Sequence, residues 1–184
     1  KDAVKLCRRA GIRPVMITGD HKDTAVAIAK EIGIIDDAAM AITGQELDKV
    51  KDEDYKELVT KYSVYARVSP EHKVKIVKAW KENEKTVAMT GDGVNDILAL
   101  KEADCSIAMA SGSEATRNVA NIVLMESNFS AMPSVVAEGR RVINNIQRTS
   151  TLFLVTTIFT ILLTLFCLSI KTPYFYESSQ LIIM

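Results

Sequence analysis

Two acidic residues four positions apart, Asp92 and Asp96, mark the part of this sequence best suited to chemistry, the run Thr-Gly-Asp-Gly-Val-Asn-Asp at positions 90–96. The apolar run at 86–89 before it is typical of a buried strand. Both acids therefore follow a strand end, where ligands bind in open α/β sheets. Carboxylate oxygens suit Mg²⁺, and Gly93 lets a phosphate approach the backbone closely. Helix capping is the alternative interpretation, but it explains only one of the two acids.

A threonine and a lysine are further candidates for binding phosphate. Thr18 follows the apolar run Val15–Ile17, so we expect its hydroxyl at a strand end, where it could bind a phosphoryl oxygen. The Thr-Gly-Asp turn there is also typical of a helix N-cap before residues 22–31. Lys73 begins a predicted helix after Pro70, where a lysine is more often a surface residue than a catalytic one. Residue types alone leave both interpretations open.

Three segments occur in an order that resembles a known family. They are Met-Ile-Thr-Gly-Asp at 16–20, Ala-Arg-Val-Ser-Pro-Glu-His-Lys at 66–73, and the run at 90–96. Together they resemble the P-type (E1–E2) cation-transporting ATPases, whose phosphorylation domain belongs to the haloacid dehalogenase-like superfamily. The resemblance extends from residue 1 to about residue 150. Ile97-Leu98 replace the Ala-Pro of many members and leave both acids unchanged.

This resemblance implies a role for each matching residue in phosphoryl transfer. Thr18 would hydrogen-bond the phosphoryl group, and Lys73 would balance its negative charge. Asp92 would bind Mg²⁺ directly, Asp96 would support the metal and the lysine, and Asn95 would bind a phosphoryl oxygen. The implied cofactors are Mg²⁺ and ATP, and catalysis would depend mainly on positioning and electrostatics. The positions that face the bound nucleotide in the family match Gly19, Asp20 and Arg67.

The family's nucleophile, the Asp of an Asp-Lys-Thr-Gly-Thr motif, has no counterpart in this sequence. The run Lys-Asp-Thr-Ala at 22–25 is rejected because it lies in a predicted amphipathic helix and not at a strand end. We therefore expect a fragment of an ATP-driven cation pump that carries the Mg²⁺- and phosphate-stabilising half of the site, and we expect the isolated chain to be inactive. The alternatives are a membrane-anchored phosphatase of the same superfamily and a catalytically silent regulatory fragment.

Charge and cysteine content bear on other classes of function. The 23 basic and 23 acidic residues cancel, which leaves no net field for nucleic acid. The three cysteines, Cys7, Cys105 and Cys167, have neither metal-ligand spacing nor a disulfide framework, and we expect them to be small apolar core residues. His21 and His72 are expected to have surface or capping roles.

The run from Thr151 to Ile170 contains no Asp, Glu, Lys, Arg or His over its 20 residues. A helix of that length spans about 30 Å, the thickness of a hydrocarbon core, so a transmembrane helix is favoured over a buried soluble one. Lys171 alone follows the run, whereas three arginines precede it: Arg140, Arg141 and Arg148. Because basic residues favour the cytosolic side, we expect residues 1–150 to be cytosolic and the span to lie in a bacterial plasma membrane.

The transported ion is only weakly indicated. Thr157 and Thr160 stand where calcium and sodium–potassium pumps place ligands in this span; neither is a carboxylate, so a hard-ion site would need other helices. Thr156, Thr160 and Thr164 recur at helical spacing, which more often indicates helix packing. The Cys-Pro-Cys type of motif of heavy-metal pumps is missing, which favours a hard cation such as calcium. The expected partners are ATP, this cation, the lipid bilayer and the remainder of the pump.

Apolar runs alternating with amphipathic stretches indicate the α/β class, with a Rossmann-like parallel sheet and flanking helices, followed by a long helix that enters the membrane. Strands are predicted at 14–17, 64–68, 86–89, 106–109 and 122–125. Helices are predicted at 1–9, 21–31, 71–82, from about 95, at 114–120 and from 129 onward, with Asp52-Glu53-Asp54 at a solvated helix start. The helix at 21–31 should bury Ala25, Ile28, Ala29 and Ile32. The expected parts are a cytosolic phosphorylation domain (1–127), a stalk helix (128–150), the span (151–170), an outer loop (171–180) and the start of another span (181–184).

Overall fold

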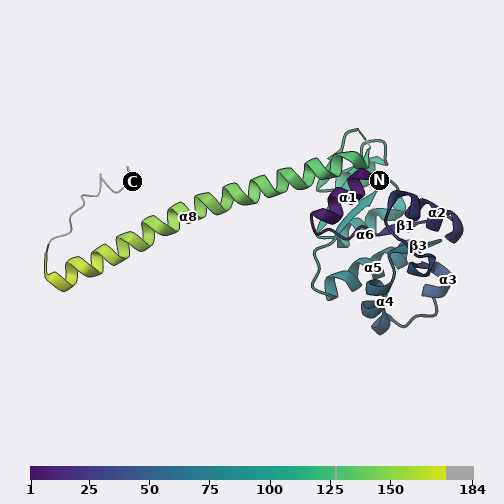
Figure 1. Ribbon diagram of the computed structural model, residues 1–184, viewed down its shortest axis with the longest axis horizontal. Helices are drawn as coiled ribbons and strands as arrows, with labels where there is room; N and C mark the ends of the chain where they lie inside the picture. Colours follow the sequence, from purple (N-terminus) through teal and green to yellow (C-terminus); the bar gives the residue numbers. More distant parts are fainter. Residues whose placement is uncertain (127, 173–184) are drawn as a thin grey trace. The chain divides into compact units, whose positions relative to one another are not determined.

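Six short parallel strands form two three-stranded sheets in the computed structural model of this chain, which describes residues 1–126 and 128–172 (Figure 1). The strand orders are β1-β3-β2 and β4-β5-β6, and the pairings within both sheets are parallel. Both sheets belong to one compact unit, Lys1–Pro133. The predicted α/β class, with parallel sheets and flanking helices, is confirmed.

The first sheet places β3 between two neighbours. β3 (Val64–Ala66) is buried at all its positions, as expected of a strand that is covered on both faces. The last residues of β1 (Met16–Thr18) and β2 (Ala41–Thr43) both align with Ala66, so the carboxyl ends of the three strands meet at one edge. β2 was not predicted, because the apolar run at 38–42 that leads into it consists mostly of alanine, which is depleted in strands.

The second sheet has β5 (Cys105–Met109) between β4 (Ala88–Gly91) and β6 (Ile122–Leu124). β4 begins two residues later than the strand predicted at 86–89. The reason is Val87, whose amide donates to Oδ2 of Asp104 (2.8 Å) and whose carbonyl accepts from the amides that begin the next strand. At the other end of β4, Gly91 pairs with Ala108 of β5, and the first acid of the 90–96 run follows it directly.

Short helices connect the strands, and capping residues set several of their ends. α2 (Lys22–Ile32) ends at Gly33, whose φ of +84° is the left-handed conformation that glycine adopts without a Cβ penalty. α5 (Pro70–Glu82) begins with a capping box between Ser69 and His72. The other helices and 3₁₀ turns of this unit are α1 (Asp2–Arg9), α3 (Gly44–Leu47), α4 (Tyr55–Lys61), α6 (Ile97–Glu102), α7 (Glu114–Val119), η1 (Ala38–Met40), η2 (Asp52–Asp54), η3 (Val94–Asp96) and η4 (Phe129–Ala131).

Apolar side chains cover both faces of the first sheet. One face of β3 packs with Ala25 and Ala29 of α2, and both alanines are fully buried. The other face presents Tyr65, which packs with residues of α4 and α5. This alternation is what a strand between two helical layers requires. The prediction that Ile28 is buried was wrong: it is 40% exposed, because it lies about 80° around the helix from the midpoint of the two alanines.

α8 (Met132–Ile170) is a continuous helix of 39 residues, where one long helix was predicted from residue 129 onward. Pro133 lies in its first turn, where its missing amide costs no helical hydrogen bond. Within the described residues, this is the one helix long and apolar enough to cross a membrane, judged by length and composition. A second unit begins at Ser134. The predicted outer loop and second span fall largely on residues 173–184, outside the described part of the chain.

Candidate functional site

The predicted site residues follow the carboxyl ends of three strands. Thr18 is the last residue of β1, Arg67 follows β3 directly, and Asp92 follows β4 directly. In a parallel sheet these ends lie at the edge where loops gather around a ligand. The topology therefore provides the positions that were predicted from sequence.

The loop after β4, residues 91–96, folds back on its own second acid. The carboxylate of Asp96 accepts the amide of Gly93 at Oδ2 (3.3 Å), and its own amide donates to the carbonyl of that glycine (3.0 Å). Asp96 is only 7% exposed. Gly91 makes this packing possible, because a Cβ there would lie 2.6 Å from the Cβ of Asp96. The loop needs a residue without a side chain at that position.

Asp92 is the acid that stays open to solvent. Its residue is exposed, and no hydrogen bond or ion pair joins its carboxylate to any residue that the structure describes. A free carboxylate is what a hard cation requires as a ligand, and Mg²⁺ is usually held by one or two protein carboxylates with water and substrate phosphate completing its shell. No group of three or more His, Cys, Asp or Glu side chains that could hold a metal occurs within the described residues. The donor set therefore fits a Mg²⁺ ion that also binds a phosphate, and it does not fit a protein-only cage.

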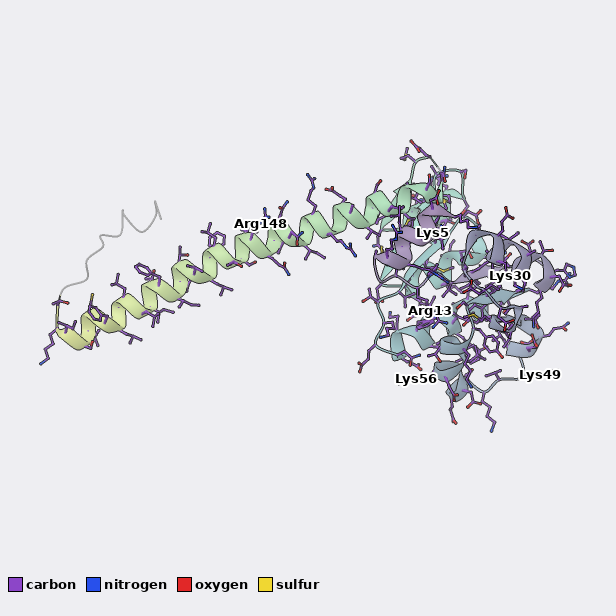
Figure 2. All side chains as sticks on the ribbon, in the orientation of Figure 1. Lys5, Arg13, Lys30, Lys49, Lys56 and Arg148 are labelled. Carbon is purple, nitrogen blue, oxygen red and sulfur yellow. The ribbon has the colours of Figure 1, made fainter. Side chains whose placement is uncertain are left out.

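Lys73 is paired and largely buried, unlike the lysines at the surface of this unit. Its Nζ lies 2.6 Å from Oδ1 of Asp96, and the two side chains are 15% and 10% exposed. Lys5, Lys30 and Lys56, by comparison, are exposed on the helices that carry them (Figure 2). The capping box that begins α5 fixes the first turn of the helix, so the lysine that follows it is aimed at the loop after β4. The residue that sequence position alone would have placed at the surface is thus part of a buried ion pair.

The loop after β1 forms a compact turn that is tied to the loop after β3. The hydroxyl of Thr18 donates to Oδ2 of Asp20 (3.0 Å) and accepts the amide of the same residue (3.1 Å). The amide of Arg67 donates to the carbonyl of Asp20 (3.1 Å), and its guanidinium contacts Nε2 of His21. Arg67 has a φ of +51°, a strained conformation for a residue with a side chain, held here by hydrogen bonds from the neighbouring loop.

The turns after β1 and β3 and the acidic loop after β4 remain separate clusters in the described residues. No hydrogen bond or ion pair connects Thr18, Asp20 or Arg67 to the loop at 91–96. Gly19 and Asn95 are exposed, and a Cβ added to the glycine would meet nothing within 4 Å. The roles of all eight residues stay predictions.

His72 has the capping role that was predicted for it. Its Nδ1 accepts the amide of Ser69 (3.2 Å), which requires the proton to be on Nε2, and Nε2 lies 2.9 Å from Oδ1 of Asp48. The histidine therefore joins the start of α5 to the end of α3. Its contact with the site is indirect, through the helix that carries Lys73.

Sequence reasoning missed a group of residues that contacts the acidic loop. The segment after β5 runs alongside it: the amide of Ser113 donates to the carbonyl of Asp92 (2.8 Å), and the hydroxyl of Thr116 donates to the carbonyl of Gly93 (3.1 Å). A Cβ at Gly112 would lie 2.6 Å from the carbonyl oxygen of Asp92. The Ser-Gly-Ser run at 111–113, which begins two residues after the end of a predicted strand, was the available signal.

Comparisons with known proteins agree with this architecture. A family model described as haloacid dehalogenase-like hydrolase matches residues 1–104. Calcium-transporting ATPase 1 of Lactococcus lactis is 48% identical over 147 residues, which is 80% of this chain and 17% of that protein. Calcium-transporting ATPase 1 of Bacillus cereus is 49% identical over 167 residues, 90% of this chain and 19% of that protein. The chain thus spans about a fifth of the length of these curated relatives.

Two solved structures share the fold. A zinc-transporting PIB-type ATPase in an E2.Pi state superposes with a TM-score of 0.69 at 26% sequence identity, covering 90% of this chain and 23% of that one. The catalytic domain of a CPx-ATPase, studied for its changes on nucleotide binding, gives a TM-score of 0.56 at 28% identity, covering 73% of this chain and 43% of that one. The first similarity extends well beyond the residues matched by the family model.

Proposed function

Since the chain belongs to the haloacid dehalogenase-like hydrolases and is part of a P-type ATPase, we propose that it supplies half of the phosphorylation site of an ATP-driven cation pump. One observation carries the proposal: the free carboxylate of Asp92 lies in a loop whose other acid, Asp96, is already neutralised by Lys73. That arrangement leaves the carboxylate of Asp92 for a metal and the ammonium group of Lys73 beside it. A phosphoryl group in transfer requires such positive charge around its oxygens.

Each side chain then has a distinct task. Asp92 binds Mg²⁺, which when present neutralises charge on the phosphoryl oxygens. Asp96 holds Lys73 at the site edge, so that the ammonium group can also approach a phosphoryl oxygen. The hydroxyl of Thr18 turns from Asp20 to hydrogen-bond the phosphoryl group, and Asn95 donates to another of its oxygens. Little covalent chemistry is asked of these residues, because positioning and charge neutralisation dominate phosphoryl transfer.

The nucleotide is expected at the second cluster. Arg67 and Asp20 project from adjoining loops, and Gly19 between the strand and α2 leaves an open approach. A guanidinium suits a phosphate or a flat base, and it is held in place here by its contact with His21. We propose that ATP binds across this surface.

The nucleophile is proposed to come from a separate strand. β1 pairs only with β3, and β4 pairs only with β5, so each sheet within the described residues has an open edge at a strand that carries site residues. A parallel strand added at either edge would bring its carboxyl end close to Thr18 or to Asp92. No Asp-Lys-Thr-Gly-Thr run occurs in this chain, and we therefore expect the isolated chain not to form a phosphoenzyme.

The membrane part of the proposal rests on α8. The charge-free run at 151–170 lies wholly within this helix, and arginines precede it. We infer that residues 1–150 lie on the cytosolic side of a bacterial plasma membrane and that the span contributes to the path of a hard cation. The similarity to proteins named calcium-transporting ATPases supports calcium as that cation.

The decisive test uses Asp92→Asn in the full-length protein. The amide oxygen is a much weaker ligand for a hard cation than a carboxylate, so acid-stable labelling from γ-³²P-ATP should be nearly abolished. Asp23→Asn is the matched control, because that exposed acid lies on α2 and should leave labelling unchanged. Near-normal labelling of Asp92→Asn would contradict the proposal, and labelling of the isolated 184-residue chain would contradict the assignment of the nucleophile.

A further inference from the structure

The residues at the start of α7 contact the backbone of the acidic loop and not its carboxylates. Both carbonyls of the Asp92-Gly93 dipeptide accept hydrogen bonds from this segment, one from the amide of Ser113 (2.8 Å) and one from the hydroxyl of Thr116 (3.1 Å). The amide of Gly93 donates to the carboxylate of Asp96. The backbone around the proposed metal ligand is therefore fixed on both sides, while the carboxylate itself stays free.

The two hydroxyls form a directed chain that ends at the loop. Ser113 Oγ accepts the amide of Thr116 (3.1 Å), and the two hydroxyl oxygens are also within hydrogen-bond distance of each other. Because the hydroxyl proton of Thr116 is used on the carbonyl of Gly93, the serine must donate to the threonine oxygen. Thr116 is completely buried, so water cannot replace either bond without a rearrangement of the loop.

Arg117 holds the segment that carries this clamp. Its Nη1 donates to the carbonyl of Ala110 (2.9 Å) and to that of Gly112, which closes the turn between β5 and α7. Gly112 lies so close to Asp92 that a Cβ would be 2.9 Å from the aspartate's Cα. The backbone of this turn is thus packed directly against the backbone of the acidic loop.

From these contacts we infer that Thr116 and Ser113 are positioning residues for the proposed Mg²⁺ ligand: they set the direction of the Asp92 carboxylate by holding its backbone. This inference rests on the proposed function of Asp92. A metal ligand that must point at one place gains affinity when its loop is fixed before binding, and partners outside the coordination shell change metal affinity substantially. A side chain that only stabilised the fold would have no such effect on the metal.

The test compares Mg²⁺ binding, in the presence of inorganic phosphate, by variants of the full 184-residue chain in detergent micelles, followed by the amide resonance of Gly93. Thr116→Val removes the hydroxyl at nearly constant volume and should weaken Mg²⁺ binding about tenfold or more. Thr116→Ser restores the hydroxyl and should recover the wild-type affinity. Thr60→Val is the matched control, since the hydroxyl of this exposed residue donates to the carbonyl of Glu57 within α4, and its loss should leave Mg²⁺ affinity unchanged.

A second measurement separates positioning from stability. The amide of Asp96 donates to the carbonyl of Gly93, so its hydrogen exchange reports how well the loop is held. In Thr116→Val it should exchange about fivefold faster, with the amide of buried Tyr65 unchanged. Equal acceleration of both amides with wild-type Mg²⁺ affinity would show a purely structural role and overturn the inference.

Two remaining outcomes are also decisive. If Thr116→Val fails to fold, Ser113→Ala replaces it, and unchanged Mg²⁺ affinity together with unchanged exchange of the Asp96 amide would overturn the inference. If Asp92→Asn binds Mg²⁺ as well as the wild type does, the proposed metal ligand is wrong. In that case Thr116 and Ser113 cannot position a metal ligand, even if the exchange data still show that they hold the loop.

Discussion

The buried pair between Lys73 and Asp96 gives the sharpest energetic prediction. Lys73→Met removes the cation and leaves a carboxylate that is 10% exposed with one remaining donor, the amide of Gly93. Breaking a buried pair on one side costs about 3–5 kcal/mol because the other charge stays uncompensated. Since the pair keeps some exposure and that amide still donates, we expect a cost near the lower limit, about 3 kcal/mol of unfolding free energy.

The double variant Lys73→Met, Asp96→Asn separates the interaction free energy of the pair from the contribution of each side chain. Asp96→Asn keeps an oxygen that can accept the amide of Gly93, so the main loss in that variant is the charge opposite Lys73. Combining it with Lys73→Met leaves two neutral side chains and should cost little more than either single change. We therefore expect a coupling free energy of at least about 2 kcal/mol.

A matched surface pair provides the control. Lys75 and Asp52 lie at the same Nζ–Oδ1 distance of 2.6 Å and are also 23 residues apart, but their side chains are 44% and 79% exposed. Their coupling in the variants Lys75→Met and Asp52→Asn should be about 0–1 kcal/mol, because solvent screens exposed charges. The comparison isolates burial as the variable.

Urea unfolding followed by fluorescence suits this experiment. Trp80 is the single tryptophan of the chain and lies on α5, the helix that carries both lysines. The four variants of each cycle can be measured under conditions where the transition is two-state. Additivity at the buried pair within about 0.5 kcal/mol would refute the reasoning, since it would show that the two groups do not interact in the folded protein.

Three further predictions concern the frame around the site. Gly112→Ala should destabilise the chain by about 1–3 kcal/mol in urea unfolding, because its Cβ would meet backbone atoms of the loop after β4, whereas the same change at exposed Gly139 should not. His72→Gln should cost less than His72→Ala by about 1 kcal/mol, since Gln can complete the capping box and loses only the contact with Asp48; equal losses would contradict this. The pKa of Glu46 lies below its ordinary value because the hydroxyl and amide of Thr43 donate to its carboxylate, so this cap stabilises the fold at neutral pH and is lost as the pH falls through the lowered pKa. Glu46→Gln should remove that acid dependence from unfolding measured as a function of pH, and an unchanged pH profile would exclude the mechanism.

The framework of strands and helices was predictable because it depends on local patterns. Short apolar runs indicated β1, β3, β4, β5 and β6, and the Ser-Pro start of α5 follows general capping rules. β2 was missed, since Ala41–Thr43 is three residues long and its strand state depends on pairing with β3. The burial of Ile28 was misjudged because a helical wheel gives the direction of a face and not its width.

The site was predictable where chemistry and sequence position coincide. Asp92 and Asp96 were placed correctly after a strand, but which of them is buried and which is free depends on the close packing of Gly91 against one of them. The role of Thr116 lies beyond any local pattern, because its hydroxyl reaches a carbonyl 23 residues earlier in the chain. Contacts of that range come from the order of strands in a sheet, which a single sequence indicates only weakly.

The threonines of α8 have a consequence for any ion that passes beside this helix. The hydroxyls of Thr157, Thr160 and Thr164 each donate to the carbonyl four residues earlier, at 2.8 Å. These three threonines therefore turn their oxygens toward the helix backbone and their methyl groups outward, so they add to the apolar surface of the span. Rotation about χ1 exchanges the positions of the hydroxyl and the methyl group. Threonine is the β-branched residue that populates two χ1 rotamers in a helix. A χ1 rotation of one threonine therefore suffices to offer its hydroxyl oxygen to a cation beside the helix, without any change in the backbone.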